Sequence, residues 1–264
     1  MAITDNRAMA SITAPRRVTT PWRSALARRA ELIRTVAPEG ERGPALRLLL
    51  GELGAFAAPV RRVVARPLIV PRAEHPRVVM LLPGFGTHPL RMRYMARRLE
   101  SAGHVVKRWG LGFNFGPSEE NFALLEARVG DLEARYGQQL VLVGWSLGGV
   151  FAREIAKRIP QSIAKVITMG SPFSGSAYAN NAWKVYQLVT GHAVDQPPVE
   201  AQLAVKPPVE TVALWSPRDG VIAPRSARGR PGERDRARAL RCTHLGFANS
   251  DEAIRAVAQE LERI

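Results

Sequence analysis

The sequence predicts one α/β domain, built on a mainly parallel sheet with helices on both faces. From about Arg77 onward, short β-branched runs alternate with longer helical patterns, and this alternation is typical of parallel strands joined by helical crossovers. The 264 residues suffice for one sizeable core, whereas two full domains would each be small. The composition, 46% hydrophobic and 23% charged, is that of a globular protein.

The strands are expected where short apolar runs stop at turn residues. The first run, from Arg77 to Leu82, stops at Pro83-Gly84, which does not continue a buried strand. The other strands are expected at His104 to Trp109, Leu140 to Val143, Lys165 to Met169, Thr211 to Trp215 and Ala239 to Cys242. Helical patterns occupy Pro89 to Ser101, Glu119 to Tyr136, Leu147 to Ile159 and Asp251 to Arg263. In such sheets the chemistry lies in loops at the carboxyl ends of the strands.

Three segments are expected along the chain. Residues 1–43 are rich in Ser, Thr, Arg and Pro, and predict a basic, loosely ordered N-terminal extension with one helix-like run from Ser24 to Val36. Residues 44–264 form the predicted domain, which begins with an amphipathic helix from Pro44 to Ala58. Residues 172–208 interrupt the strand and helix rhythm with Gly, Asn and two Pro-Pro pairs. We therefore expect a short cap or lid inserted there.

The basic composition limits the classes of partner. The net charge is +15, and all but five of the 38 basic residues are arginines spread along the whole chain. Clustered cations would favour a polyanion, but no aromatic-basic RNA signature and no zinc-ligand spacing is present. We expect a solvated basic surface and no nucleic-acid partner. Weak association with an anionic membrane surface stays open, because Arg61, Arg62 and Arg66 follow the amphipathic helix.

Cysteine usage and hydropathy suggest the compartment. The single cysteine, Cys242, excludes an internal disulfide and agrees with a reducing compartment. The first thirty residues contain no apolar segment typical of a secretory signal. The most apolar stretch, Ala45 to Val60, carries two charges and is shorter than the roughly 20 residues of a spanning helix. We expect a cytoplasmic protein, with peripheral membrane attachment left open.

A serine is expected at a sharp turn between a strand and a helix. Residues 141–149 read Val-Leu-Val-Gly-Trp-Ser-Leu-Gly-Gly, which contains the pattern G-x-S-x-G. The serine of such a turn lies on strained backbone, and Gly144 and Gly148 avoid clashes there. The following helix points free N–H groups at the serine, where an oxyanion would develop. Ser146 is the predicted nucleophile.

A serine hydroxyl needs a base, and the base needs a carboxylate to orient it. Asp219 lies in the loop after the strand Thr211 to Trp215, and His244 lies in the loop after the next predicted strand. The order serine, acid, histidine is the one used on parallel sheets with this serine turn. Ser146, Asp219 and His244 are the predicted catalytic residues. Taken alone, Asp219 also fits an Asp-Gly turn and His244 a structural histidine.

Two backbone N–H groups are predicted to bind the oxyanion. The first belongs to Leu147, directly after the serine, and the second to Phe85 in the loop Leu81 to Gly86. The predicted substrate contacts are His88, Trp145 and Phe173.

Five motifs fall at the ends of predicted strands. They are Leu-Leu-Pro-Gly-Phe-Gly at Leu81, Gly-Trp-Ser-Leu-Gly-Gly at Gly144, Met-Gly-Ser-Pro-Phe at Met169, Ser-Pro-Arg-Asp-Gly-Val at Ser216 and Thr-His-Leu-Gly-Phe at Thr243. Together they resemble the α/β-hydrolase superfamily, and more narrowly its bacterial lipase and carboxylesterase-like serine hydrolases. The resemblance covers Arg77 to Ile264 and implies the α/β-hydrolase fold and acyl transfer to water, without cofactor or metal. One departure is Pro83-Gly84, where the family usually has His-Gly.

The predicted function is hydrolysis of carboxylic esters through an acyl-enzyme on Ser146. A small-molecule or lipid-like ester is the expected substrate, and the cap aromatics favour moderately apolar acyl chains. These aromatics are Phe173, Tyr178, Trp183 and Tyr186. An acyltransferase with the same acyl-enzyme, or a non-catalytic basic binding protein on a hydrolase scaffold, are the alternatives. The sequence favours no particular oligomeric state.

Overall fold

The computed structural model describes residues 21–54, 68–199 and 201–263, and its centre is a six-stranded sheet. The strand order is β2-β1-β3-β4-β5-β6, and each neighbouring pair is parallel. The strands are β1 (Val78–Leu82), β2 (Val105–Arg108), β3 (Leu140–Trp145), β4 (Ile163–Met169), β5 (Glu210–Trp215) and β6 (Arg236–Ala239). The predicted α/β fold with a mainly parallel sheet is confirmed.

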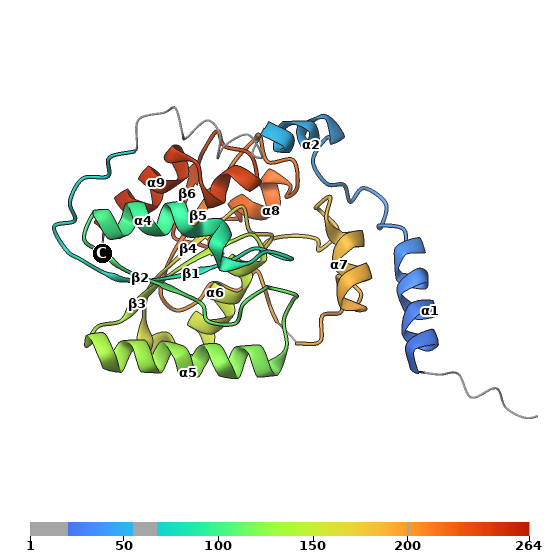
Figure 1. Cartoon of the computed structure of the whole chain (residues 1–264). Coiled ribbons are helices and arrows are strands. Elements are labelled where there is room, and N and C mark those ends of the chain that lie inside the picture. The colour runs from blue at the N-terminus through green and yellow to red at the C-terminus, as the bar shows by residue number, and fades with distance from the viewer. Residues whose placement is uncertain (1–20, 55–67, 200, 264) are drawn as a thin grey trace, which may run out of the picture.

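Helices cover both faces of this sheet. The α-helices are α1 (Pro21–Arg34), α2 (Leu46–Glu52), α4 (Arg93–Ser101), α5 (Glu119–Tyr136), α6 (Leu147–Arg158), α7 (Trp183–Thr190), α8 (Pro224–Arg228) and α9 (Asp251–Leu261). Short 3₁₀ turns are η2 (Pro89–Met92), η3 (Pro160–Ser162) and η4 (Leu245–Ala248). Helices α4 and α9 lie on one face, and α5 and α6 lie on the other (Figure 1).

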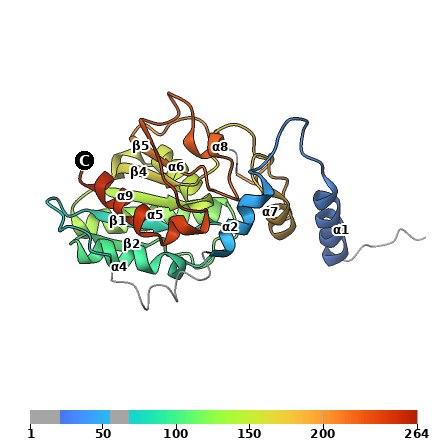
Figure 2. The same ribbon diagram turned by 90° about the horizontal axis from the view of Figure 1, so that it is seen from above.

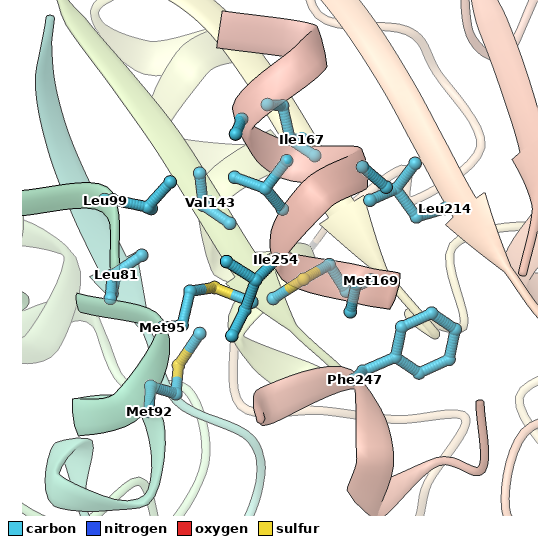
Figure 3. Close-up of a cluster of buried hydrophobic side chains, with 14 of the residues drawn as sticks. Leu81, Met92, Met95, Leu99, Val143, Ile167, Met169, Leu214, Phe247 and Ile254 are labelled. Carbon is cyan, nitrogen blue, oxygen red and sulfur yellow. The ribbon is translucent and has the colours of Figure 1, made fainter. Parts of the chain in front are cut away.

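The core consists of two apolar layers, one on each face of the sheet. In the first layer, strand side chains meet side chains of η2, α4, α9 and η4 (Figure 3). Its labelled members are Leu81, Met92, Met95, Leu99, Val143, Ile167, Met169, Leu214, Phe247 and Ile254. The neighbouring strand residues, such as Met80 and Leu142, point to the other face and meet Phe122 and Phe151. Because both faces are covered, β1 and β3 are continuous apolar runs.

Helix α1 lies beside α7, at the edge of the molecule (Figures 1 and 2). The amide of Gln187 donates a hydrogen bond of 2.6 Å to the carbonyl of Leu32, and the guanidinium of Arg29 donates one of 3.0 Å to the carbonyl of Leu188. Residues 21–34 belong to the segment for which a loosely ordered extension is expected. In the structure they form a helix attached to the predicted cap.

The last strand differs from the prediction. It was expected at Ala239 to Cys242, but β6 is Arg236–Ala239. This edge strand carries alternate arginines, and Arg236 pairs with the carboxylates of Glu210 and Glu260. A strand with charged side chains has no apolar run to reveal it, and charge is common on sheet edges. The apolar stretch that suggested a strand instead leads into the loop of His244.

Two further expectations concern the N-terminal half of the domain. The predicted helix from Pro44 to Ala58 corresponds to α2, which ends at Glu52, and residues 55–58 lie outside the described residues. Within the described ranges, no helix combines the length and apolar character needed to cross a bilayer.

Candidate active site

The turn at Ser146 has the geometry that the sequence pattern predicts. Ser146 lies between β3 and α6 with φ of 54° and ψ of −124°, and among the described residues it is the one non-glycine residue with positive φ. A side chain at Gly148 would place its Cβ 2.2 Å from the carbonyl oxygen of Leu82, and one at Gly144 would lie 2.3 Å from the oxygen of Gly148. Both glycines are therefore required by close backbone contacts.

Asp219 and His244 form a buried hydrogen-bonded pair. Oδ2 of Asp219 lies 2.8 Å from Nδ1 of His244. The other carboxylate oxygen accepts hydrogen bonds from the backbone N–H groups of Val221, at 2.8 Å, and Ile222, at 2.7 Å. An ionised carboxylate only accepts hydrogen bonds, so Nδ1 carries a proton and Nε2 of the neutral ring is left as an acceptor. This is the tautomer that a general base requires.

The pair lies beside the serine turn. The indole N–H of Trp145, the residue before the serine, donates a 3.0 Å hydrogen bond to the carbonyl of His244, and the two rings are 5.8 Å apart between centroids. No hydrogen bond joins Ser146 Oγ to the imidazole within the described part of the chain. Such bonds are often long in free enzymes and shorten when substrate binds. The structure thus brings together the acid and the histidine, next to the turn that carries the serine.

The loop after β1 packs directly on the serine turn. A side chain at Gly84 would lie 3.2 Å from Cβ of Ser146. The buried Asn114 fixes this loop through two hydrogen bonds of 2.7 Å. Its side-chain Nδ2 donates to the carbonyl of Pro83, and its backbone carbonyl accepts from the N–H of Gly86. The two predicted oxyanion donors, the N–H groups of Phe85 and Leu147, donate no hydrogen bond to another described residue. They are free for a ligand.

Ser146 lines an apolar cavity that is partly open to solvent. The lining includes Phe85, Leu147, Val150, Trp183, Tyr186 and Ile222. Burial raises the pKa of Tyr186 to about 12, so its hydroxyl is neutral at ordinary pH. The lining also includes Glu154, whose carboxylate pairs with Lys157. Apart from this ion pair the cavity suits an uncharged, apolar group.

The three predicted substrate contacts do not line this cavity. His88 caps η2, accepting a hydrogen bond from the N–H of Leu90, and lies against Phe113. Trp145 is buried under the serine turn, and Phe173 is buried beneath the guanidinium of Arg153 at 4.1 Å. Trp145 and Phe173 are held away from the cavity by core packing. His88 is held by its contacts with Leu90 and Phe113 at the surface.

The cap aromatics divide into two groups. Trp183 and Tyr186, which lie on α7, line the cavity. Tyr178 packs edge-on against Trp183, with ring centroids 5.2 Å apart, and like Phe173 it is buried away from the cavity.

Sequence reasoning missed three buried polar residues that support the site. Besides Asn114, these are Ser216, whose hydroxyl donates a 2.6 Å hydrogen bond to the carbonyl of Cys242, and Glu52, whose carboxylate accepts from the loops of Asp219 and His244. A signal existed for Glu52, since it is one of two charges in the otherwise apolar stretch from Ala45 to Val60. Polar loop residues such as Asn114 carry no comparable signal.

Cys242 is not a candidate nucleophile. Burial raises the pKa of its thiol to about 12, so the reactive thiolate is scarce at neutral pH. No group of three or more His, Cys, Asp or Glu side chains in the described ranges is arranged to hold a metal ion.

Fold and site geometry together define a class of protein. The family model of the α/β hydrolase fold matches residues 77–223. The chain belongs to the α/β hydrolase fold family. The resemblance in the sequence motifs is thereby confirmed at the level of the superfamily.

The curated relatives include proteins named pimeloyl-[acyl-carrier protein] methyl ester esterase. The protein of Hamiltonella defensa is 34% identical over 92 residues, which is 35% of this chain and 35% of that relative. The protein of Vibrio parahaemolyticus is 32% identical over 111 residues, which is 41% of this chain and 42% of that relative. The chain thus matches well under half the length of these curated relatives.

Solved structures share the fold at low sequence identity. The monoacylglycerol lipase of Paleococcus ferrophilus has a TM-score of 0.53 at 17% identity, over 74% of this chain and 96% of that chain. The mature lipase BlEst2 of Bacillus licheniformis also has a TM-score of 0.53 at 17% identity, over 72% of this chain and 95% of that chain. These likenesses establish the fold alone.

Proposed function

We propose that this protein is a carboxylic ester hydrolase that works through an acyl-enzyme on Ser146. His244 takes the proton of the serine hydroxyl as Ser146 attacks the ester carbonyl, and Asp219 orients and stabilises the imidazolium. The N–H groups of Phe85 and Leu147 hold the tetrahedral oxyanion. His244 then protonates the leaving alcohol, and water, activated by the same histidine, releases the acid. His244 passes the proton of the serine to the leaving alcohol, and returns the proton of the water to Ser146.

The observation that carries this proposal is the conformation of Ser146. A positive φ at a serine is costly, and such backbone strain occurs mainly where function requires it. Here the strained serine faces an apolar cavity, beside a buried hydrogen-bonded pair of aspartate and histidine. A non-catalytic binding protein would have no need for this combination.

The cavity supports a moderately apolar acyl group as substrate. Its lining includes Leu147 and Val150 of α6 together with Trp183 and Tyr186 of α7. Residues 172–208, which include α7, are proposed to act as the cap over the serine. The names of the matched relatives, methyl ester esterases, support an ester as the bond that is cleaved.

The nucleophile is tested by labelling with a fluorophosphonate probe. We expect wild type to be labelled and to hydrolyse p-nitrophenyl esters, and Ser146→Ala to lose both by about 10⁴-fold or more, because the acyl-enzyme cannot form. The matched control is Ser101→Ala, since Ser101 is exposed and its hydroxyl only bonds the carbonyl of Arg98. Labelling that persists in Ser146→Ala would refute the assignment.

The reaction type is tested by product analysis. A series of acyl chain lengths is expected to give an optimum at intermediate length, and absence of turnover at every length would contradict an esterase. Added alcohol acceptors distinguish the acyltransferase alternative. We expect the free acid as the main product, whereas a dominant new ester would favour transfer.

A further inference from the structure

A buried carboxylate that the proposed mechanism does not use contacts both loops of the acid and the base. Glu52, the last residue of α2, is 5% exposed. Its Oε1 accepts hydrogen bonds from the backbone N–H of His244 at 2.7 Å and of Gly220 at 2.9 Å, and its Oε2 accepts one from the N–H of Leu245 at 2.8 Å. One side chain therefore binds the base itself and the residue directly after the acid.

The helix that carries Glu52 is seated on the same loops. The backbone of α2 passes so close to Gly220 that a Cβ there would lie 2.6 Å from the carbonyl of Leu48. Just before α2, the amide of Asn181 donates hydrogen bonds to the carbonyl of Pro44 at 3.0 Å and to that of Gly220 at 2.8 Å. The position of α2 is thus fixed at both ends, which gives Glu52 a rigid base.

The contacts of Glu52 are charge-assisted and directed at backbone. No ion pair with Glu52 is found in the described part of the chain, so the three N–H groups are what compensates its burial. Hydrogen bonds from N–H groups to a carboxylate are about twice as strong as neutral ones. Removing the charge leaves up to three amide donors unsatisfied between two loops that approach from different strand ends.

We propose that Glu52 is a positioning residue, which holds the loops of Asp219 and His244 in the relative geometry that proton transfer requires. The proposal rests on the proposed function, because it assigns Glu52 a role in the same site. Helix α2, which precedes the part of the chain matched by the family model, is then part of the catalytic support. Misplacing a catalytic group by about 1 Å costs on the order of 100-fold in rate.

The test replaces Glu52 by glutamine, which keeps the size of the side chain but presents an NH₂ group to backbone donors. We expect kcat for an ester substrate to fall about 10- to 100-fold, with KM within about twofold, because Glu52 does not line the substrate cavity. The matched control is Glu120→Gln, an identical chemical change at an exposed position in the first turn of α5. It should leave kcat unchanged.

A readout without turnover separates this proposal from the proposed function. The proton between Nδ1 of His244 and Asp219 should give a downfield ¹H resonance in wild type and in Glu120→Gln, assigned by its loss in Asp219→Asn. In Glu52→Gln the resonance should broaden or disappear, because the loops no longer hold the pair together. If wild type neither reacts with the probe nor hydrolyses esters, the proposed function fails, and this resonance still decides the positioning role.

The proposal would be overturned by a Glu52→Gln variant with wild-type kcat and an intact resonance. If the melting temperature of that variant also falls, Glu52 contributes to stability alone. Should Glu52→Gln fail to fold, Glu52→Asp is measured in the same way, because it keeps the charge and shortens the reach by one methylene group.

Discussion

The close contacts around the serine leave no room for side chains at its glycines. Gly148 touches the carbonyl of Leu82, and Gly149 faces the hydroxyl of Ser171, which a Cβ would approach to 2.0 Å. These contacts pack the first turn of α6 against the ends of β1 and β4. The strain at Ser146 can persist because the surrounding backbone holds it from several sides.

A methyl group at Gly148 should therefore disrupt the turn. In Gly148→Ala the new Cβ must displace the carbonyl of Leu82, so we expect a loss of about 1–3 kcal/mol in the free energy of unfolding and labelling of Ser146 about 100-fold slower. Denaturant melts and probe kinetics measure the two effects. Gly130→Ala is the control, because this exposed glycine within α5 has nothing within 4 Å of the added Cβ. It should be neutral or stabilising by up to about 1 kcal/mol, and a similar result for Gly148→Ala would contradict the packing argument.

At the scale of elements, a buried arginine joins α6 to the returning end of the cap segment. The guanidinium of Arg153 donates hydrogen bonds of 3.1–3.2 Å to the carbonyls of Leu203 and Val205, and one of 3.1 Å to that of Glu233. Burial lowers its pKa to about 10, so the group still carries its charge at pH 7. One end of the proposed cap is thus anchored to the helix that follows the proposed nucleophile.

Replacing this anchor should destabilise the protein markedly. Arg153→Met keeps much of the apolar stem but leaves several part-buried carbonyls without their donor, so we expect the free energy of unfolding to fall by about 3 kcal/mol. Urea denaturation measures the change. Arg255→Met on the exposed face of α9 serves as the control and should shift stability by less than about 0.5 kcal/mol. Equal effects in both variants would show that the carbonyl contacts contribute little.

Elements with a strong hydrophobic pattern were predictable, and those held by polar contacts were not. Helix α5 occupies the predicted range from Glu119 to Tyr136, and the central strands lie within two residues of their expected starts and ends. The position of strand β6 was not predicted, because its arginines form polar contacts at the edge of the sheet and leave no apolar run in the sequence. The packing of α1 on α7 depends on contacts such as Gln187 with Leu32, between residues 155 positions apart. No local pattern encodes partners at that separation.

In the candidate site, too, the residues within sequence motifs were predictable and those held by distant polar contacts were not. Sequence order and loop position pointed to Asp219 and His244, which the structure brings to 2.8 Å. Glu52 lies before the first predicted strand, outside every motif, and its role depends on how α2 docks. The prediction that Trp145 contacts the substrate rested on its position next to Ser146. A side chain at the end of a strand can face either the core or the cavity, and the sequence does not tell which.

For the molecule as a whole, the net charge of +15 predicts attraction to anionic surfaces. We expect weak cosedimentation with vesicles rich in anionic lipid, worth about 1 kcal/mol for each basic residue near the surface. Binding should vanish toward 1 M salt, where the Debye length is about 3 Å. Vesicles of zwitterionic lipid are the control. Equal binding to both vesicle types would exclude an electrostatic mechanism.

The separation in sequence between Glu52 and its partners also bears on how the protein is made. Glu52 leaves the ribosome 168 residues ahead of Gly220 and 192 residues ahead of His244. The serine turn can be complete while the histidine loop is still being synthesised, yet that loop finds its anchor only after the late strands have joined the sheet. In a partly synthesised chain, Ser146 would thus be exposed while His244 is not yet ordered. Such a chain would have no hydrolase activity until its final strands assemble.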